Sequence, residues 1–331
     1  MLRDHRPRHN LAGVSHEVFQ EREFFLRQID PPIASFDHTC HRVEREVGDG
    51  QGQERGGLSP AEQRIVVVEN HGGGGGVVGT AKAAEAAPDG RTVLMATLGS
   101  HVLSPATKDP RSIPYDPVTA FEPVMLVGSV PSLLVARPSL PAGVTLRELL
   151  ALAKRAEAEK KPLNYGSAGS GSTMNVAMEL LKSAAGVEIT HIQYRGAGPA
   201  IVDLLGNHLD MLVADVNVLA PRLASGLRPV ALLGPERSPL AKDVPTTAEL
   251  GLPSVVMENW YGMLVPKDVP APVRAALERD FLQAMQAPQT VERLSPFGLR
   301  NSGNAAQFRA RLEKDQQQWG ALIRKLGIKG E

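Results

Sequence analysis

The sequence has little of several features that would assign it quickly to a class. It contains one cysteine, Cys40, so no disulfide can form within the chain. Basic and acidic residues balance to a formal net charge of +0, which gives no basic field to attract nucleic acid. No apolar run approaches the ~18 residues of a membrane-spanning helix. No signal peptide is visible either, because residues 1–30 lack the apolar central segment that a signal peptide contains.

The composition that remains is that of an ordinary soluble globular protein. The chain has 331 residues, of which 42% are hydrophobic, enough for an ample core and about two domains. Residues 1–63 differ from the rest, because stretches such as "VGDGQGQERGG" are rich in Arg, Gly and Gln and follow no period of 2 or 3.6 residues. This segment is expected to be disordered or loosely attached.

From Arg64 onward, apolar strands alternate with amphipathic helices, a pattern that predicts an α/β fold with parallel sheets. We expect strands at Ile65–Val68, Thr92–Thr97, Phe121–Val127, Ser132–Ala136, Asn164–Tyr165, Ile189–Gln193, Met211–Ala214, Pro229–Leu233 and Tyr261–Val265. We expect helices at Thr80–Ala87, Thr145–Glu159, Ser172–Ala185, Gly198–Gly206, Pro272–Ala287, Gln289–Leu294 and Ala305–Leu326. Thr145 and Glu148 form a capping box at the start of one of them.

A run of five glycines, Gly72 to Gly76, joins the first of these strands to the helix that follows. Glycine permits positive φ and lets a ligand approach backbone N–H groups, and a helix N-terminus favours an anion. Three interpretations compete: a flexible linker, a dinucleotide fingerprint built on Gly74, Gly76 and Gly79, or an anion site. The fingerprint lacks the acidic residue expected at the end of the next strand, so the rest of the chain favours the anion site.

Three further loops of similar character follow strands. They are "TLGSHVLSP", the serine-rich "NYGSAGSGSTMN" and "YRGAGPA". Since ligands bind at the carboxyl ends of strands in open α/β sheets, the four loops suggest one shared crevice. Backbone and hydroxyl donors are plentiful there, whereas Arg195 is the one fixed cation in these loops. This balance favours a small anion held mainly by neutral donors.

Several of these stretches, together with "NWYGMLVP" and "WGALIRKLGIK", resemble the substrate-binding proteins of tripartite tricarboxylate transporters, also called Bug receptors. The resemblance covers roughly residues 64–328 in order. It implies a periplasmic binding protein fold of type II, with two α/β domains, two crossover strands as a hinge and a cleft between the domains. We expect domain I to comprise residues 64–125 and 231–331, domain II to comprise 126–230, and the crossovers to lie near Val124–Val135 and Arg228–Leu233.

The resemblance also implies a set of ligand-binding residues. They are Gly73, Gly74, Gly75, Gly76, Ser100, His101, Ser167, Ala168, Gly169, Ser170, Ser172, Thr173, Tyr194, Arg195 and Asp215. Asp215 could meet a ligand ammonium or hydroxyl, or simply cap a turn. Arg195 could pair with a second carboxylate or remain solvated. Trp260 and Tyr261 could border the cleft or pack in the core.

One departure from the family pattern concerns the start of the chain. The family begins with a strand and a Pro-Gly-Gly loop that contacts ligand, and neither is recognisable before Arg64. Without that strand, neighbouring strand edges in domain I would stay unpaired. We therefore expect that residues 1–60 are not the native start of such a receptor; a shifted reading frame would explain their composition.

The function implied is that of a periplasmic receptor, acting as a monomer without catalysis, cofactor or metal. It would capture a small di- or tricarboxylate or related acid by hinge closure and deliver it to a membrane permease. Two alternatives remain open. The liganded receptor could activate a membrane signalling protein, or the chain could be a nucleotide-dependent enzyme that uses Gly74 to Gly79. The sequence does not identify the carboxylate.

Overall fold

The computed structural model describes residues 39–44 and 65–329 of the chain. The disorder and reading-frame expectations for residues 1–38 and 45–64 lie outside this description. The strands are β1 Thr39–Glu44, β2 Ile65–Asn70, β3 Thr92–Thr97, β4 Phe121–Ala136, β5 Asn164–Ser167, β6 Thr190–Gln193, β7 Met211–Asp215, β8 Arg228–Leu233, β9 Glu258–Pro266 and β10 Gly303–Asn304. The α-helices are α2 Val77–Ala84, α3 Ser104–Thr107, α4 Leu146–Ala158, α5 Thr173–Ala185, α6 Ala197–Leu205, α7 Val216–Leu219, α8 Ala271–Gln286, α9 Pro288–Leu294 and α10 Ala305–Leu326.

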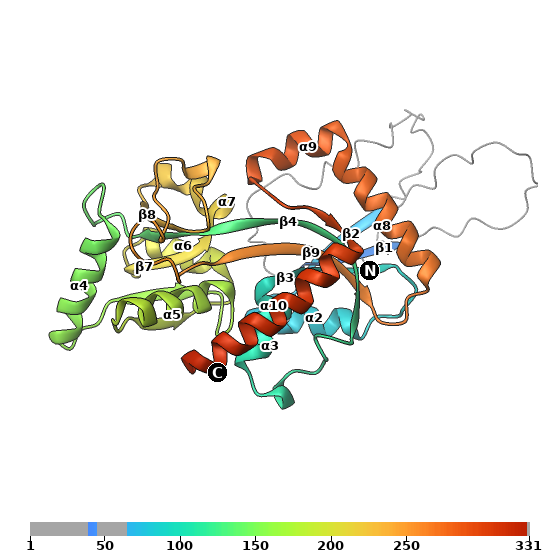
Figure 1. Ribbon diagram of the computed structural model, residues 1–331, viewed down its shortest axis with the longest axis horizontal. Helices are drawn as coiled ribbons and strands as arrows, with labels where there is room; N and C mark the ends of the chain where they lie inside the picture. The colour runs from blue at the N-terminus through green and yellow to red at the C-terminus, as the bar shows by residue number, and fades with distance from the viewer. Residues whose placement is uncertain (1–38, 45–64, 330–331) are drawn as a thin grey trace, which may run out of the picture.

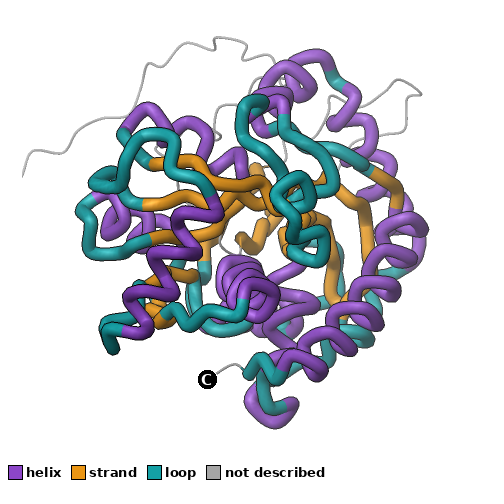
Figure 2. The backbone as a smooth tube through the Cα atoms, turned by 60° about the vertical axis from the view of Figure 1, so that its left-hand side comes forward, coloured by secondary structure: helices purple, strands orange, loops and turns teal. Residues whose placement is uncertain are grey.

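The described strands form one mixed sheet whose main path is β2-β1-β3-β9-β4-β7-β5-β6, with β8 and β10 also paired to β4. We call β1, β2, β3, β9, β10 and the start of β4 the first half, and β5 to β8 with the end of β4 the second half. Figure 1 shows β4 and β9 running side by side from one half toward the other. Figure 2 shows helices packed on both sides of the strands.

The expectation of parallel sheets is correct only for β5, which pairs in parallel with β6 and β7. The pairs β3–β9, β4–β9, β4–β7 and β4–β8 are antiparallel. The reason is that β4 and β9 carry the chain between the halves in opposite directions. A pattern of alternating strands and helices cannot reveal such a reversal, because it reports local periodicity and not pairing.

The two strands expected at Phe121–Val127 and Ser132–Ala136 are one continuous strand, β4. Gly128 and Pro131 lie between the two expected strands, but pairing with β9 continues through both of them, with register shifts at Pro123/Met125 and Leu126/Gly128. Gly128 has φ +155°, and a side chain there would meet Leu299 and the Arg300 carbonyl at 3.0 Å. The glycine therefore permits the irregularity that keeps the crossover strand intact.

The second crossover is β9, and not Arg228–Leu233 as the sequence suggested. Strand β8 pairs with the end of β4 in the second half. The chain stays there until Met257, whose N–H donates to the Leu233 carbonyl. Strand β9 then pairs with β4 from Glu258 onward and with β3 farther along. Residues 231–257 therefore lie with the second half, whereas the sequence analysis placed the return to domain I at residue 231.

Strand β1 lies between β2 and β3 and is antiparallel to both. The sequence analysis expected no strand within residues 1–63 and an unpaired edge in this position. That expectation is wrong for Thr39–Glu44, which pair with both neighbours. The backbone groups of β2 and β3 at this place thus have ladder partners, as buried strand edges require.

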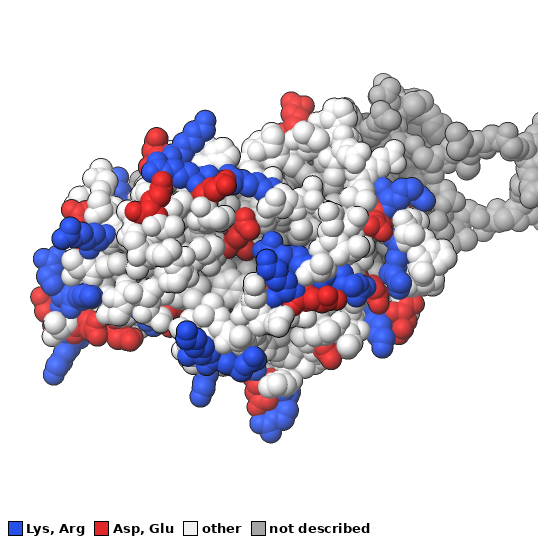
Figure 3. Space-filling model, in the orientation of Figure 1, with Lys and Arg blue, Asp and Glu red and all other residues white. Residues whose placement is uncertain are grey.

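Two helices begin at capping boxes, whereas α2 begins and ends three residues earlier than the predicted Thr80–Ala87. Thr145 and Glu148 form both hydrogen bonds of the capping box before α4, as expected. Asn304 and Gln307 do the same for α10. Helix α10 covers the first half, where Trp260 and Phe308 are fully buried with ring centroids 5.1 Å apart. Figure 3 shows acidic and basic side chains interspersed over the visible face, so no field of one sign dominates it.

Candidate functional site

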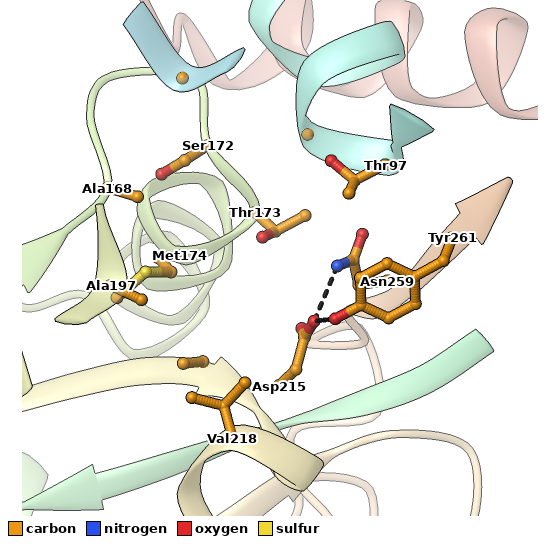
Figure 4. Close-up of a pocket in the computed structure, with 13 residues that line it drawn as sticks. Thr97, Ala168, Ser172, Thr173, Met174, Ala197, Asp215, Val218, Asn259 and Tyr261 are labelled. Atoms are coloured by element: carbon orange, nitrogen blue, oxygen red, sulfur yellow. Dashed lines mark hydrogen bonds between the residues drawn. The ribbon is translucent and has the colours of Figure 1, made fainter. Parts of the chain in front are cut away.

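A small cavity of about 50 Å³ lies where the two halves meet. It has room for roughly four water-sized groups, since one water needs about 10–15 Å³ by this measure. The first half supplies Gly75, Thr97, Gly99, Asn259 and Tyr261, and the second half supplies Ala168, Ser172, Thr173, Met174, Ala197, Ala214, Asp215 and Val218. Figure 4 shows these side chains around the cavity. All four loops that follow strands contribute to it.

The glycine run forms a fixed turn between β2 and α2. Gly73 to Gly76 all have positive φ, from +61° to +126°, which L side chains rarely adopt. A Cβ on Gly75 would lie 2.4 Å from the Ser104 Oγ and 3.0 Å from the Ser170 carbonyl oxygen. The Ser104 hydroxyl also donates to the Gly75 carbonyl at 2.8 Å. The turn is therefore anchored on α3 and packed against the serine-rich loop between β5 and α5, which we call the serine loop. A flexible linker would not be fixed in this way.

The serine loop leads from β5 into α5 and places the start of that helix at the cavity. Ser172 is the N-cap, and its Oγ accepts from the Asn175 N–H. The next two residues, Thr173 and Met174, line the cavity in the first turn. First-turn N–H groups have no partner within a helix, and the helix dipole is positive at this end. The arrangement offers donors and a favourable field to an anion.

The turns that follow β3 and β6 also line the cavity. Thr97 ends β3, and Gly99 follows it so closely against α5 that a Cβ there would lie 3.2 Å from the Thr173 N. After β6, the chain turns at Gly196, which has φ +131°, and starts α6 with Ala197 at the cavity. The N-terminal ends of α5 and α6 therefore both meet the cavity.

The opposite wall is a hydrogen-bonded cluster of Asp215, Asn259 and Tyr261. Asp215 ends β7, and its carboxylate accepts from the Asn259 Nδ2 at 2.8 Å and from the Tyr261 hydroxyl. All three side chains are buried. The dashed lines in Figure 4 mark these two bonds. Asp215 is the residue before α7, but its side chain makes no cap bond there, so it does not simply cap a turn.

Strand β9 positions two members of this cluster by alternation. Successive side chains of a strand point to opposite faces, so Asn259 and Tyr261 share one face and Trp260 takes the other. Trp260 lies in the core and donates to the Asp315 carboxylate at 2.8 Å. Of the two possibilities left open for Tyr261, the structure therefore places it at the cavity wall and Trp260 in the core.

The Asn259 amide has one satisfied end and one unsatisfied end. Its Nδ2 faces Asp215, whereas its Oδ1 is buried with no hydrogen-bond partner. In Figure 4 the oxygen points away from Asp215 toward the region near Thr97. An unsatisfied buried acceptor costs about 1–3 kcal/mol, so its presence in a folded protein calls for an explanation.

The electrostatics of the cavity depend on backbone and hydroxyl groups. None of the residues that line it is Lys, Arg or His, and Asp215 is its one carboxylate. An anion in the cavity would therefore be held by N–H groups, Ser172 and the threonine hydroxyls and not by a fixed cation. The Asp215 carboxylate would repel that anion unless the negative group of the ligand lies at the end of the cavity away from Asp215.

The structure brings together only part of the predicted site. Of the residues proposed from the sequence, Gly75, Ala168, Ser172, Thr173 and Asp215 line the cavity. Gly73, Gly74, Gly76, Ser100, His101, Ser167, Gly169, Ser170, Tyr194 and Arg195 do not. The sequence analysis placed the loops of Thr97, Gly99, Met174 and Ala197 at the crevice but did not list these residues as ligand-binding; it did not consider Ala214, Val218 and Asn259, and it left Tyr261 undecided.

Ser100 and His101 are core residues in a turn of π-helix, Gly99–Leu103. The Ser100 Oγ exchanges hydrogen bonds with the Thr97 backbone. His101 is 1% exposed, and its ring meets Phe121 edge-on at 5.5 Å. Burial lowers the pKa of His101 to about 4, so the ring is neutral at pH 7.

The side chains of Ser167 and Ser170 form hydrogen bonds that stabilise the serine loop. The Ser167 Oγ lies 2.6 Å from the His191 Nε2 and accepts from the Gly169 N–H at 3.1 Å. The Ser170 hydroxyl donates to the Gln193 side chain at 3.3 Å. Ser167 is fully buried, so it shapes the loop without lining the cavity.

The predicted acid-binding turn at Tyr194 and Arg195 faces elsewhere. The Tyr194 hydroxyl donates to Asp203 at 2.6 Å. Burial, with the nearby Asp203 carboxylate, raises the pKa of Tyr194 to about 12. Arg195 is exposed. The turn contributes Ala197 to the cavity in their place.

Metal-binding clusters and membrane-spanning helices are both absent from the part of the chain that the structure describes. No group of three or more His, Cys, Asp or Glu side chains among residues 39–44 and 65–329 is arranged to hold a metal ion. In the same part of the chain, no helix is both long and apolar enough to cross a membrane.

Two α/β halves joined by crossover strands, with a cavity between them, are the architecture of the periplasmic binding protein class. Residues 53–328 match the family described as tripartite tricarboxylate transporter family receptor. The chain belongs to this family, whose members include the Bug proteins.

Individual relatives agree with this assignment. BugT of Bordetella pertussis is 31% identical over 320 residues, which cover 96% of this chain and 93% of BugT. An R. palustris protein solved with adipate superposes with a TM-score of 0.72 at 27% identity, over 79% of this chain and 86% of that one. MatC from Rhodopseudomonas palustris, solved with bound malate, gives a TM-score of 0.70 at 28% identity, over 77% and 86% of the two chains.

Proposed function

We propose that this chain is a periplasmic receptor that binds a small carboxylate between its two halves and delivers it to a tripartite tricarboxylate-type permease. The observation that carries the proposal is the position of the cavity. It lies between the halves, where the Gly75 turn packs against the loop that leads into α5, and Asp215 and Asn259 line it as well. An anion bound there would contact both halves at once.

The mechanism follows from that position. Ligand carboxylate oxygens accept from first-turn N–H groups of α5 and from the Ser172 and Thr173 hydroxyls. Because these donors belong to the second half while Gly75, Thr97 and Asn259 belong to the first, a ligand that touches both sets stabilises the closed arrangement selectively. Closure around one ligand is then the signal that the permease recognises.

The relatives support the chemistry of the ligand. Two neighbours of this fold were solved with adipate and with malate, which are both small carboxylates. The family of this chain is one of receptors, so the nucleotide-dependent enzyme considered from the sequence is not favoured.

A thermal-shift screen of the full-length chain tests the proposal. The panel comprises dicarboxylates, tricarboxylates, nicotinate-like aromatic acids and acidic amino acids, with the uncharged succinamide as a control. We expect at least one acid to raise the melting temperature, since a ligand at about 100 times its Kd stabilises by about 2.7 kcal/mol. Calorimetry should then give one site per chain.

Two outcomes would count against the proposal. One is a panel in which no acid binds, and the other is equal binding of succinate and succinamide, because the site would then not recognise a carboxylate. The transport role has a separate test. Growth on the bound acid should depend on the permease genes, and growth that is independent of them would remove the permease from the proposal.

A further inference from the structure

We propose that Glu179 is a positioning residue of this receptor, which acts through Tyr165 and Asn175 to hold the serine loop in place at the cavity. The inference rests on the proposed function and adds to it a residue that does not line the cavity. The serine loop reaches the cavity through Ala168 and Ser172 (Figure 4). Glu179 lies farther along the chain, within α5.

A chain of side-chain hydrogen bonds connects Glu179 to the serine loop. The Tyr165 hydroxyl donates to the Glu179 Oε1 at 2.7 Å. The Asn175 Nδ2 donates to the Tyr165 hydroxyl oxygen at 2.8 Å, and the Asn175 Oδ1 accepts from the Gly171 N–H at 3.0 Å. Tyr165 is fully buried and Asn175 is 4% exposed, so bulk water does not compete for these bonds.

The direction of this chain is fixed at both ends. The Gly171 N–H can only donate, so it requires the oxygen of the Asn175 amide. At the other end, the Lys182 ammonium donates to both Glu179 oxygens, at 3.0 and 3.1 Å. The Glu179 carboxylate accepts the single Tyr165 hydroxyl hydrogen, which leaves the Tyr165 oxygen to accept from the Asn175 NH₂ group. Burial, with the nearby Glu179 carboxylate, raises the pKa of Tyr165, so the hydroxyl keeps that hydrogen.

Gly171 is a point where the serine loop meets the first half. It has φ +80°, and a Cβ there would lie 2.3 Å from the Thr107 Oγ1 and 2.9 Å from the Ser104 Cα. The Ser104 hydroxyl also donates to the Gly75 carbonyl, so α3, the glycine turn and the serine loop meet here. The bond between Gly171 and Asn175 therefore fixes the loop where little space remains for it to move.

Loss of Glu179 would break the chain of hydrogen bonds at its start. The Tyr165 hydroxyl would lose its carboxylate acceptor, and the Asn175 amide would offer a replacement by turning its oxygen toward Tyr165. That turn takes the acceptor away from the Gly171 N–H and releases the loop. Binding would then weaken although the lost side chain touches no cavity residue of the loop.

Hydrogen exchange and calorimetry on the full-length chain test this role. In ligand-free Glu179→Ala, exchange of the Gly171 N–H, followed by NMR, should accelerate at least about 5-fold more than exchange of the β7 amides in the same half. A general loss of stability would accelerate both equally. Calorimetry with succinate, and with the panel acid that gives the largest thermal shift, should show binding at least about 5-fold weaker.

A conservative variant and a matched control separate Glu179 from its surroundings. Glu179→Gln keeps an oxygen that can accept from Tyr165, so exchange and affinity should stay within about 2-fold of the unchanged chain. Glu188→Ala is the control, because the Glu188 carboxylate lies 3.8 Å from the same Lys182 ammonium but its side chain is 73% exposed. This variant should leave both measurements unchanged.

Tyr165→Phe breaks the chain one link farther on and keeps the test open if Glu179→Ala does not fold. It should accelerate Gly171 exchange as Glu179→Ala does. Because Glu179 acts through Tyr165, adding Glu179→Ala to Tyr165→Phe should change exchange and affinity by less than about 2-fold.

Three results would overturn the inference and leave the proposed function standing. They are Gly171 exchange that rises no more than that of β7, unchanged affinity in a variant whose Gly171 exchange has risen, and a full added effect of Glu179→Ala in the Tyr165→Phe background. If no acid binds the unchanged chain, the proposed function fails, and the ligand-free exchange rates still show whether Glu179 holds the loop.

Discussion

At the scale of single residues, one wall of the cavity is a hydrogen-bonded cluster. The Asp215 carboxylate accepts from the side chains of Asn259 and Tyr261. The same two residues would be unremarkable in a sequence, because Asn and Tyr occur in strands for many reasons. Their role follows from the alternation of β9, which fixes Trp260 in the core and turns its two neighbours to the cavity.

His101 provides a residue-scale prediction about stability. Its pKa is about 4 in the folded chain, because of burial, and near 6.5 when unfolded. Between these values the unfolded state binds more protons, so stability falls as the pH drops from 6.5 toward 4. From pH 7 to pH 5 this single group should remove about 2 kcal/mol. Urea unfolding at both pH values measures the loss.

Two variants isolate the contribution of His101. His101→Leu should lose about 2 kcal/mol less than the unchanged chain over the same pH interval. His208→Leu is the matched control, because His208 is exposed and its replacement should leave the pH dependence as it was. Equal pH dependence in all three proteins would show that His101 is not held neutral by burial.

The sequence revealed part of the site at this scale and could not reveal the rest. Gly75, Ser172 and Thr173 stand in loops whose glycines and hydroxyls mark them locally. Asn259 lies far along the chain from these loops, and its place beside Asp215 depends on β4 lying between β7 and β9. Ser100 and His101 are buried in a π-helical turn and do not line the cavity, and such burial leaves no trace in residue type.

At the scale of secondary-structure elements, the site depends mainly on the N-terminus of α5. Most elements after Arg64 could be predicted because their signals are local: the capping box of α4, the β-branched run of β2 and the apolar stripe of α10. Strand β3 has the predicted bounds at both ends. The continuity of β4 and the antiparallel pairing of β9 could not be predicted, since both depend on partners distant in sequence.

A charge placed at the start of α5 tests its role as an anion site. Thr173 is the first residue of the helix, where Asp is favourable by about 0.3–1 kcal/mol. Thr173→Asp should therefore fold at least as stably as the unchanged chain. It should bind the preferred carboxylate at least about 10-fold more weakly, because two carboxylates would then meet in the cavity. Calorimetry and thermal melting measure the two effects.

The control for this variant places the same charge on another helix. Ala271 is the first residue of α8 and is exposed, so Ala271→Asp adds the same charge at a helix start away from the cavity. Its carboxylate affinity should stay within about 2-fold of the unchanged chain. Equal affinity in Thr173→Asp and Ala271→Asp would remove α5 from the binding site.

At the scale of the whole molecule, two strands carry the chain between the halves and several loops close the space between them. Strands β4 and β9 pair along most of their length, with the irregularities of β4 near the crossing. On the cavity side, Gly75 packs against Ser170 and Gly99 against Thr173, so loops of opposite halves touch. A carboxylate between them would bind both halves and oppose their separation.

X-ray scattering during a carboxylate titration tests this central claim most directly. The full-length chain is titrated with the acid that binds best in calorimetry, and the radius of gyration is followed at each step. If one carboxylate holds both halves together, the radius should fall in step with the calorimetric binding curve and stop changing at one ligand per chain. A ligand that binds with measurable heat while the scattering profile stays the same would contradict the account.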